Sequence, residues 1–272
     1  MRQPGSAPAD APAKTVRLGD RSVEYHLRRS ARSRGLRVTI DPRLGLVVSV
    51  PPATRRGWAQ PDVHVEGFLR ERRAWVVRHL DRLEWERASA RARGGARDGG
   101  QLPYRGLLHR IRVRPATIAG RRSRVERTGG EDDELVISVA TGERRSIDRI
   151  LGAWFRDRAA EAIDAAIATH AGAVGVRPSK VDIRDPRSRW GSASRTGRLM
   201  FSWRLVLAPP ASLETVVVHE LAHLRAFGHG PAFWALVAGR RPSHLADRAW
   251  LRRNSHALHT ALEATSPDQA PE

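Results

Sequence analysis

The sequence of 272 residues contains no cysteine. This absence excludes disulfide bonds, cysteine-ligated zinc, iron–sulfur clusters and thiol catalysis. It fits a reducing compartment, so we expect a cytoplasmic protein. Long hydrophobic runs are missing too, because no apolar stretch approaches 18 residues, and we expect no membrane span. The first 14 residues have no apolar core of the kind that a secretory signal needs.

Lysine is also scarce, since Lys14 and Lys180 are the only lysines among 48 basic residues, against 29 acidic ones. The formal net charge is +19, and a field this positive attracts polyanions without regard to sequence. Two interpretations stay open: a solvated basic surface, and a surface that binds nucleic acid non-specifically. We find no zinc finger, RNA-recognition aromatics or basic zipper. We expect a monomer.

Hydrophobic periodicity predicts a β-rich N-terminal region with one long helix over residues 15–144, after a disordered lead-in at 1–14. A helix is expected at 62–90, because apolar residues recur there at three-to-four spacing. The stretch 89–101 is rich in Gly and Arg, and we expect a mobile loop with nothing to bury. Alternation and turn residues predict strands at 23–27, 36–40, 46–50, 107–114, 121–127 and 134–139.

The C-terminal region, residues 145–260, mixes both kinds of pattern, so the predicted fold class is α+β. The strand at 199–205 is expected to turn Met200, Phe201 and Trp203 toward packed layers. Residues 261–272 are expected to be a disordered tail. The expected elements of the region are helices at 146–171, 210–227, 231–239 and 243–257 and strands at 181–183 and 199–205.

The predicted helix at 210–227 contains the sequence His219-Glu220-Leu221-Ala222-His223. Residues four apart share one helix face, so two imidazoles at this spacing can hold one zinc ion. Glu220 can then take a proton from water at the open side of the metal. A catalytic zinc needs a third protein ligand, and His229 can supply it. Gly228 can adopt the left-handed conformation that ends a helix and turns the chain back.

A histidine pair at this spacing also occurs by chance, on surfaces or at core edges. Val216-Val217-Val218 directly precede the motif and are poor helix formers, so we expect burial to hold this helix. Buried polar groups without partners cost about 1–3 kcal/mol each, and a metal ion would satisfy them. The spacing H-E-x-x-H-x5-H equals that of metzincins, but Ala226 replaces their turn glycine and no Met-turn is evident.

Four segments resemble the YgjP-like metallopeptidase family, which is related to SprT-like zincins. The resemblance implies a zincin-like catalytic domain whose helix carries the HExxH motif, with Zn2+ as cofactor. It implies His219, His223 and His229 as zinc ligands and Glu220 as catalytic base. Weaker similarity extends back to about residue 23. The segments are RWGSAS at 189–194, FSWRLVLAPP at 201–210, VVHELAHL at 217–224 and HGPAFW at 229–234.

Three positions depart from the family pattern. Ala193 stands where Cys is common, and Ser202 where Asn is frequent. Gly228-His229-Gly230 stands where Asn-His-Ser is frequent, a mild change because Gly and Asn both tolerate left-handed backbone. The ligands and the base are intact, so we expect an active enzyme.

Further candidates for substrate or transition-state contacts are Arg189, Gly191, Ser192 and Arg204. The arginines could stabilise an oxyanion or grip phosphate, or they could form salt bridges with Asp182 or Asp185. We expect Gly191 or Ser192 within about 10 Å of the three histidines, in a wall beside the strand at 199–205, whose edge would face the substrate. Trp190 and Trp203 are expected in the core, with substrate stacking as the alternative, and Phe233 and Trp234 are expected to pack the helix that follows His229. A helix surface is expected for His244, His256 and His259.

These observations predict a zinc-dependent hydrolase, a metallopeptidase that acts on peptides or proteins. As an alternative, the same site hydrolyses nucleoside triphosphates, UTP in particular, an activity to which the family resemblance also points. The positive charge suits that substrate, but no glycine-rich phosphate loop is present, and phosphate chemistry more often uses magnesium on carboxylates. A third hypothesis is a basic nucleic-acid-associated protein with a structural metal, which would need a fourth ligand.

Overall fold

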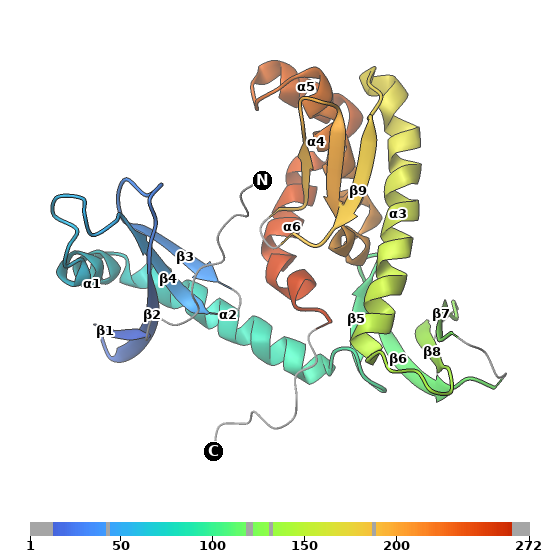
Figure 1. The fold of residues 1–272 in the computed structure, drawn as a ribbon, viewed down its shortest axis with the longest axis horizontal. Coiled ribbons are helices and arrows are strands. Elements are labelled where there is room, and N and C mark those ends of the chain that lie inside the picture. Colours follow the sequence, from blue (N-terminus) through green and yellow to red (C-terminus); the bar gives the residue numbers. More distant parts are fainter. Residues whose placement is uncertain (1–12, 42–43, 118–121, 131–132, 187–188, 263–272) are drawn as a thin grey trace. The chain divides into compact units, whose positions relative to one another are not determined.

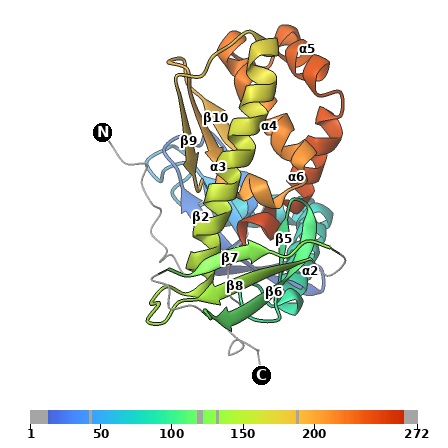
Figure 2. The same cartoon turned by 90° about the vertical axis from the view of Figure 1, so that its right-hand side faces the viewer.

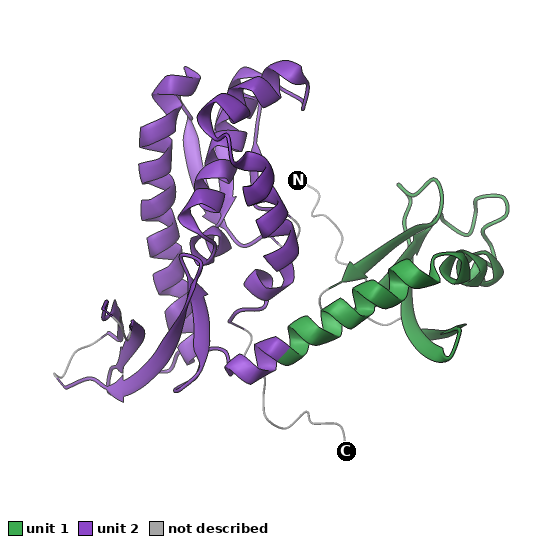
Figure 3. Cartoon of the chain, turned by 180° about the vertical axis from the view of Figure 1, so that it is seen from behind, with its two compact units in different colours: residues 1–88 green, residues 89–272 purple. Residues whose placement is uncertain are grey.

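The computed structural model describes residues 13–41, 44–117, 122–130, 133–186 and 189–262. The chain forms two compact units, residues 1–88 and 89–272 (Figure 3). The lead-in predicted at 1–14 lies outside the described residues up to residue 12, and Lys14 already begins a strand. Of the predicted tail, Ala261 and Leu262 pack against the core of the second unit, and the rest lies outside the described residues.

The first unit is built on a four-stranded sheet with the order β1-β2-β4-β3 (Figure 1). β1 and β2 form an antiparallel hairpin, β2 and β4 are parallel, and β3 is antiparallel to β4. The strands predicted at 23–27, 36–40 and 46–50 are confirmed within two residues, while β1 was not predicted. The bounds are β1 Lys14–Leu18, β2 Arg21–Arg29, β3 Arg37–Asp41 and β4 Gly45–Val50.

The long helix predicted at 62–90 is two helices, α1 (Asp62–Glu71) and α2 (Arg73–Arg93). Arg72 leaves the helical conformation, with φ −97° and ψ 18°, and ends α1. The break lets the apolar residues of both helices bury in one core against the sheet. These residues are Val65, Leu69, Val76 and Leu80.

The second unit begins with another four-stranded sheet, of order β5-β6-β8-β7. β6 and β8 are parallel, and β5 and β7 pair antiparallel at the two sides. The strands predicted at 107–114 and 134–139 are confirmed, and the one at 121–127 is confirmed from residue 124, residue 121 lying outside the described residues. The bounds are β5 Gln101–Tyr104, β6 Leu107–Pro115, β7 Arg124–Arg127 and β8 Glu134–Val139.

The prediction that residues 89–101 bury nothing is wrong. α2 continues to Arg93, and the amide of Gly99 donates a hydrogen bond to the carbonyl of Ile111 in β6. A Cβ atom at Gly100 would lie 2.3 Å from the carbonyl oxygen of Gly95, so the glycines allow two backbone segments to pack closely. The buried residues of this stretch are Gly94, Gly95, Ala96 and Gly100.

The third sheet has the order β10-β11-β9, with β11 antiparallel to β10 and parallel to β9. Its bounds are β9 Lys180–Arg184, β10 Gly191–Ala193 and β11 Arg198–Ser202. The strand predicted at 199–205 is therefore too long, because a 3-10 helix, η1, covers Trp203–Leu207. The hydroxyl of Ser202 accepts the Arg204 amide and begins this turn. Phe201 and Trp203 are buried as expected, but Met200 is only half-buried.

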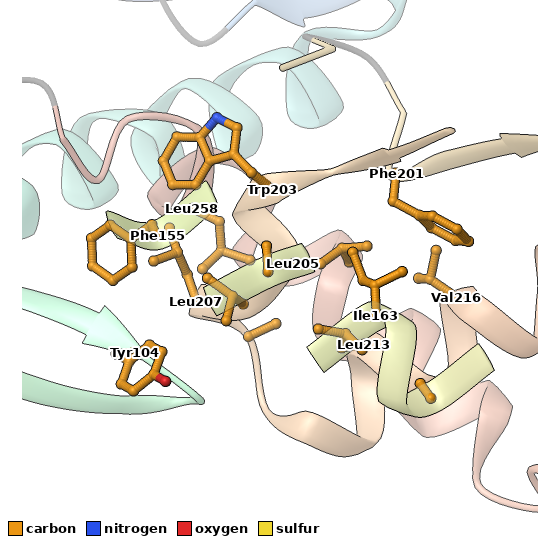
Figure 4. Close-up of a cluster of buried hydrophobic side chains, with 14 of the residues drawn as sticks. Tyr104, Phe155, Ile163, Phe201, Trp203, Leu205, Leu207, Leu213, Val216 and Leu258 are labelled. Atoms are coloured by element: carbon orange, nitrogen blue, oxygen red, sulfur yellow. The ribbon is translucent and has the colours of Figure 1, made fainter. Parts of the chain in front are cut away.

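Four helices complete the second unit: α3 Ile147–Val174, α4 Pro210–Arg225, α5 Pro231–Arg240 and α6 His244–His259. α3 and α4 pack against each other, and α3 reaches β9 while α4 reaches β10 (Figures 1 and 2). Their shared core contains Phe155 and Ile163 of α3, Phe201 of β11 and Leu213 of α4 (Figure 4).

The same core also includes Leu102, Ile111 and Leu135 from the β5–β8 sheet. This is why the structure divides at residues 88/89, whereas the sequence predicts a division at 144/145. The α+β class is confirmed. No helix in the described part of the chain is long and apolar enough to cross a membrane.

Candidate metal centre

Two histidines of the motif come from α4, a helix that packing holds in place. Pro210 occupies its first turn, where a missing amide hydrogen costs nothing. Val217 and Val218 are fully buried, which confirms that burial supports this β-branched stretch. His219 and His223 follow one turn apart, with ring centroids 4.8 Å from each other.

The third histidine returns to this pair through a turn after the helix. α4 ends at Arg225, and Gly228 has a left-handed φ of +93°. Gly228 therefore acts in the loop beyond the helix and not at the helix end, where the sequence places it. His229 Nε2 lies 3.3 Å from His219 Nε2, and ligand atoms of the three histidines all lie within 4.8 Å of one another.

This donor set fits a zinc ion. Two nitrogens bound to tetrahedral zinc at about 2.0–2.1 Å lie about 3.4 Å apart. The separation between His219 and His229 matches that value, and the upper limit of 4.8 Å for the three histidines exceeds it by at most about 1.4 Å, within reach of a side-chain rotation. Among the described residues the group holds three potential ligands and no fourth, so a bound metal would keep one position open.

Aromatic side chains of α5 support the three imidazoles. Phe233 is buried, and its ring centroid lies 4.9, 4.4 and 4.9 Å from those of His219, His223 and His229. Trp234 stacks on His229 at 5.6 Å. The expected packing of both residues is confirmed, and it limits how far the imidazoles can rotate.

The environment keeps two of the imidazoles neutral. Burial, together with the neighbouring histidines, lowers the pKa of His219 to about 3. Burial and the proximity of His229 lower the pKa of His223. Because only a neutral imidazole offers a lone pair to a metal, these shifts suit metal ligation near neutral pH.

Glu220 is the buried carboxylic acid beside the histidines. Only 6% of its surface is exposed, and among the described residues its carboxyl group has no hydrogen-bond partner. Burial raises the pKa of Glu220 to about 7, and the positive charge of Arg189 opposes this shift. A carboxyl group that titrates near neutrality can both accept and donate a proton.

The backbone of β10 presses against this carboxyl group. A Cβ atom at Gly191 would lie 2.6 Å from Glu220 Oε1, so glycine is needed for the approach. Of the segment 189–194, Trp190 and Gly191 line the cleft beside His219 and Glu220, and the distance of about 10 Å to the three histidines stays a prediction. β10 itself lies at the edge of the three-stranded sheet, whereas β11 is the central strand. The edge strand beside α4 is thus Gly191–Ala193 and not the predicted strand at 199–205.

An open cleft of about 640 Å3 connects these groups. Its lining residues include Trp190 and Gly191 beside β11, His219 and Glu220 of α4, and His229. Ser192 pairs with Met200 in the sheet and does not belong to the lining.

The two candidate arginines differ in their surroundings. Arg189 is exposed and interacts electrostatically with Glu220. Arg204 forms a bidentate ion pair with Asp185, with Nε 3.0 Å from Oδ1, and stacks over Trp203 at 4.3 Å. For Arg204 the salt-bridge interpretation is therefore confirmed, and the residue does not line the cleft.

Sequence reasoning missed the contribution of α6. Arg248, Leu251, Arg252 and Ser255 line the cleft from this helix. Their spacing of three and four residues places them on one helix face. This spacing is visible in the sequence, but no known motif accompanies it. The surface position expected for its histidines is wrong for His244 and His256, which are buried, and His259 is half-buried against Trp190.

The chain matches a model of a known protein family. A model described as YgjP-like, metallopeptidase domain, matches residues 34–254. Searches of curated proteins and of solved structures found no match. The matched range includes the three histidines, Glu220 and the cleft-lining part of α6 up to Arg252. The chain therefore belongs to the YgjP-like family of metallopeptidase domains, which places it among the hydrolases.

Proposed function

We propose that the chain is a zinc-dependent peptidase in which His219, His223 and His229 hold the ion and Glu220 is the general base. The observation that carries the proposal is a buried glutamic acid beside three convergent histidines at an open cleft. A bound zinc ion would offer an open position to water, lower the pKa of that water toward about 7 and polarise a scissile carbonyl.

Glu220 supplies the proton chemistry. One carboxylate oxygen accepts a proton as water attacks the carbonyl carbon, and the same carboxyl group then passes it to the leaving amine. The pKa of about 7 serves both steps, because proton transfer is most efficient when the pKa of the catalytic group lies near the working pH. Arg189, whose positive charge acts on Glu220, would attract negative charge that develops beside this carboxyl group.

The substrate would bind in an extended form along β10. The outer edge of Gly191–Ala193 can accept a peptide through main-chain hydrogen bonds, which would align a scissile bond with Glu220. An edge strand beside the metal helix, with α3 packed on that helix, supports a zincin-like domain. We assign the domain on this arrangement together with the HExxH spacing.

Nucleoside triphosphate hydrolysis is less well supported by the same cleft. Magnesium-assisted phosphate chemistry uses carboxylates as ligands, and Glu220 is the only carboxylate in the described lining. A purely structural metal is also disfavoured, because such sites are closed by four ligands and the described group has three. The peptidase proposal gives a role to the three histidines and to Glu220.

Replacing Glu220 with Gln tests the proposal. We expect peptide hydrolysis to fall by roughly 10²–10⁴ while zinc content and the folded state are retained, because the amide cannot accept the proton. Activity and bound zinc are measured on the same samples, with Glu161→Gln as the control, since Glu161 is an exposed carboxylate of α3. Parallel loss of zinc and activity would make Glu220 a ligand and contradict the assigned role.

A further inference from the structure

Two arginines of α6 form part of the cleft wall without an assigned role. Arg248 and Arg252 lie one turn apart, and both are exposed. They line the same cleft as His219, Glu220 and His229. Because Glu220 is the only acidic group among the described lining residues, this side of the cleft carries net positive charge.

Arg248 is held close to the histidines by an aromatic ring. Its guanidinium carbon lies 4.5 Å from the Trp234 ring centroid, and Trp234 lies 5.8 Å from the His219 ring. A cation–π contact fixes the stem while the N–H groups remain available to a ligand. The guanidinium is therefore within about 10 Å of the metal ligands, a span of about three extended residues at roughly 3.3–3.6 Å each.

Asp247, the acidic residue next to Arg248 in the sequence, is held by other partners. Asp247 accepts hydrogen bonds from Thr215 Oγ1 at 2.6 Å and Ser243 Oγ at 2.9 Å, and it pairs with Arg241. Within the described residues, neither Arg248 nor Arg252 forms a salt bridge.

Exposed arginines are common in a chain of net charge +19, so a guanidinium without a salt bridge does not by itself indicate a binding site. What distinguishes Arg248 and Arg252 is that both line the cleft that Gly191 of β10 also lines. A peptide that binds in this cleft beside Glu220 would meet both charges. Two guanidinium groups one turn apart are suited to a carboxylate, since each can donate two parallel hydrogen bonds.

We propose that the cleft selects peptides with an Asp or Glu side chain within about three residues of the scissile bond, and that Arg248 and Arg252 bind this carboxylate. The inference rests on the proposed peptidase function. It adds the substrate class, and it is separable from the chemistry because binding does not require hydrolysis.

The experiment uses one peptide scaffold with both ends blocked, in which Asp, Asn or Lys occupies each of the three positions on either side of the scissile bond. Binding is measured by fluorescence anisotropy to the zinc-loaded Glu220→Gln protein, and hydrolysis is measured with the unchanged protein. At one or more positions we expect Asp to exceed Lys by at least tenfold in both readouts, with a preference that weakens as salt is raised.

Variants then locate the preference. Arg248→Glu with Arg252→Glu should reverse it in favour of Lys, while Arg253→Glu, on the same helix but outside the lining, should leave it unchanged. Zinc content and thermal unfolding verify that each variant is folded, and the single Arg252→Glu variant should show a smaller effect of the same sign.

The outcomes separate the two proposals. If Glu220→Gln binds Asp peptides preferentially but the unchanged protein cleaves none, the peptidase proposal fails and the carboxylate site stands. Equal binding of Asp, Asn and Lys peptides would overturn the carboxylate site even where peptides are cleaved. A nucleoside triphosphate that binds through these arginines and excludes Asp peptides would also overturn it. Peptides with a free C-terminus that bind better than blocked Asp peptides would reassign the site to the terminal carboxylate.

Discussion

The two units differ in what they bury. The core of the first unit consists of Val and Leu side chains with one tyrosine, Tyr25. In the second unit polar side chains enter the interior, and within the described residues every buried polar or charged side chain belongs to it. They are His109, His170, Ser202, Ser212, Thr215, Glu220, His244 and His256.

Buried polar groups need partners, because an unsatisfied one costs about 1–3 kcal/mol. Thr215 meets this need by donating to Asp247 at 2.6 Å, and His109 lies 3.2 Å from Asp133. Glu220 has no such partner among the described residues, yet it borders the cleft. Among the described residues, the first unit therefore keeps its charged side chains outside the core, while the second unit keeps a costly carboxyl group where chemistry can use it.

The largest expected effect comes from removing one imidazole of the second unit. His223→Ala should lower zinc affinity by more than about 100-fold and abolish peptide hydrolysis, because even the loss of an outer-shell partner costs 10–100-fold. Elemental analysis and a peptidase assay measure both. His64→Ala, an exposed histidine of α1 in the first unit, is the control and should change neither. Full retention of zinc in His223→Ala would show that the ligand set is wrong.

A methyl group added to one glycine of each unit should lower peptide hydrolysis in the second unit and raise stability in the first. In Gly191→Ala the new Cβ would lie 2.6 Å from Glu220 Oε1, so the carboxyl group must move. We expect hydrolysis to fall by up to about 100-fold, the cost of a misplacement near 1 Å.

The matched substitution is Gly67→Ala in α1, where a Cβ meets nothing within 4 Å. It should raise the free energy of unfolding by about 0.5–1 kcal/mol, because alanine restricts the unfolded chain and favours a helix. Urea unfolding and kcat/KM are measured for both variants. Unchanged kcat/KM in Gly191→Ala would show that Glu220 is not held by β10.

Much of the site could be predicted from the sequence, because its signals are local. His219 and His223 are fixed by helix periodicity, and the valines before them indicate burial. His229 follows within ten residues of His219, so the chain has little freedom to place it elsewhere. The expectation that Gly191 lies near the three histidines rested partly on a family resemblance, and its close approach to Glu220 was not predicted.

What could not be predicted depends on contacts far apart in the sequence. Arg248 reaches the cleft only because α6 packs against α4, and no pattern announces that pairing. Gly94–Gly100 were expected to bury nothing, because a glycine-rich composition usually indicates a flexible loop. In this protein the glycines instead permit close backbone packing. The break at Arg72 has no Gly or Pro to mark it and follows from the need to bury two helices on one sheet.

A smaller effect concerns stability at acid pH. Burial lowers the pKa of His170 in the second unit, and the Glu214 carboxylate, 3.7 Å from Nε2 and beyond hydrogen-bond distance, opposes this shift only in part. The unfolded state therefore binds a proton more readily below about pH 6.5, so unfolding becomes easier as the pH falls, by at most about 1.4 kcal/mol per pH unit.

His170→Leu removes this group, and the variant should lose less stability than the unchanged protein between pH 7.5 and pH 5.5. Urea unfolding at both pH values measures the difference. An equal loss in the two proteins would show that His170 does not titrate in this way, and the polar burial of the second unit would then carry no cost at this position.

The smallest expected effect concerns polyanions and a face of the first unit. Arg28 of β2 and Arg37 of β3 both pair in register with Ser49 of β4, and both are exposed, so two guanidinium groups flank one position of the sheet.

If this face binds nucleic acid, the logarithm of affinity should fall linearly with the logarithm of salt concentration. Replacing both residues with Glu should reduce the slope by about two, since each phosphate contact contributes about 0.9. Arg110→Glu with Arg144→Glu makes the same charge change on exposed residues of the second unit and should alter the slope less. Equal changes in both variants would mean that the net charge acts as a whole, and a flat plot would mean that the basic surface is only solvated.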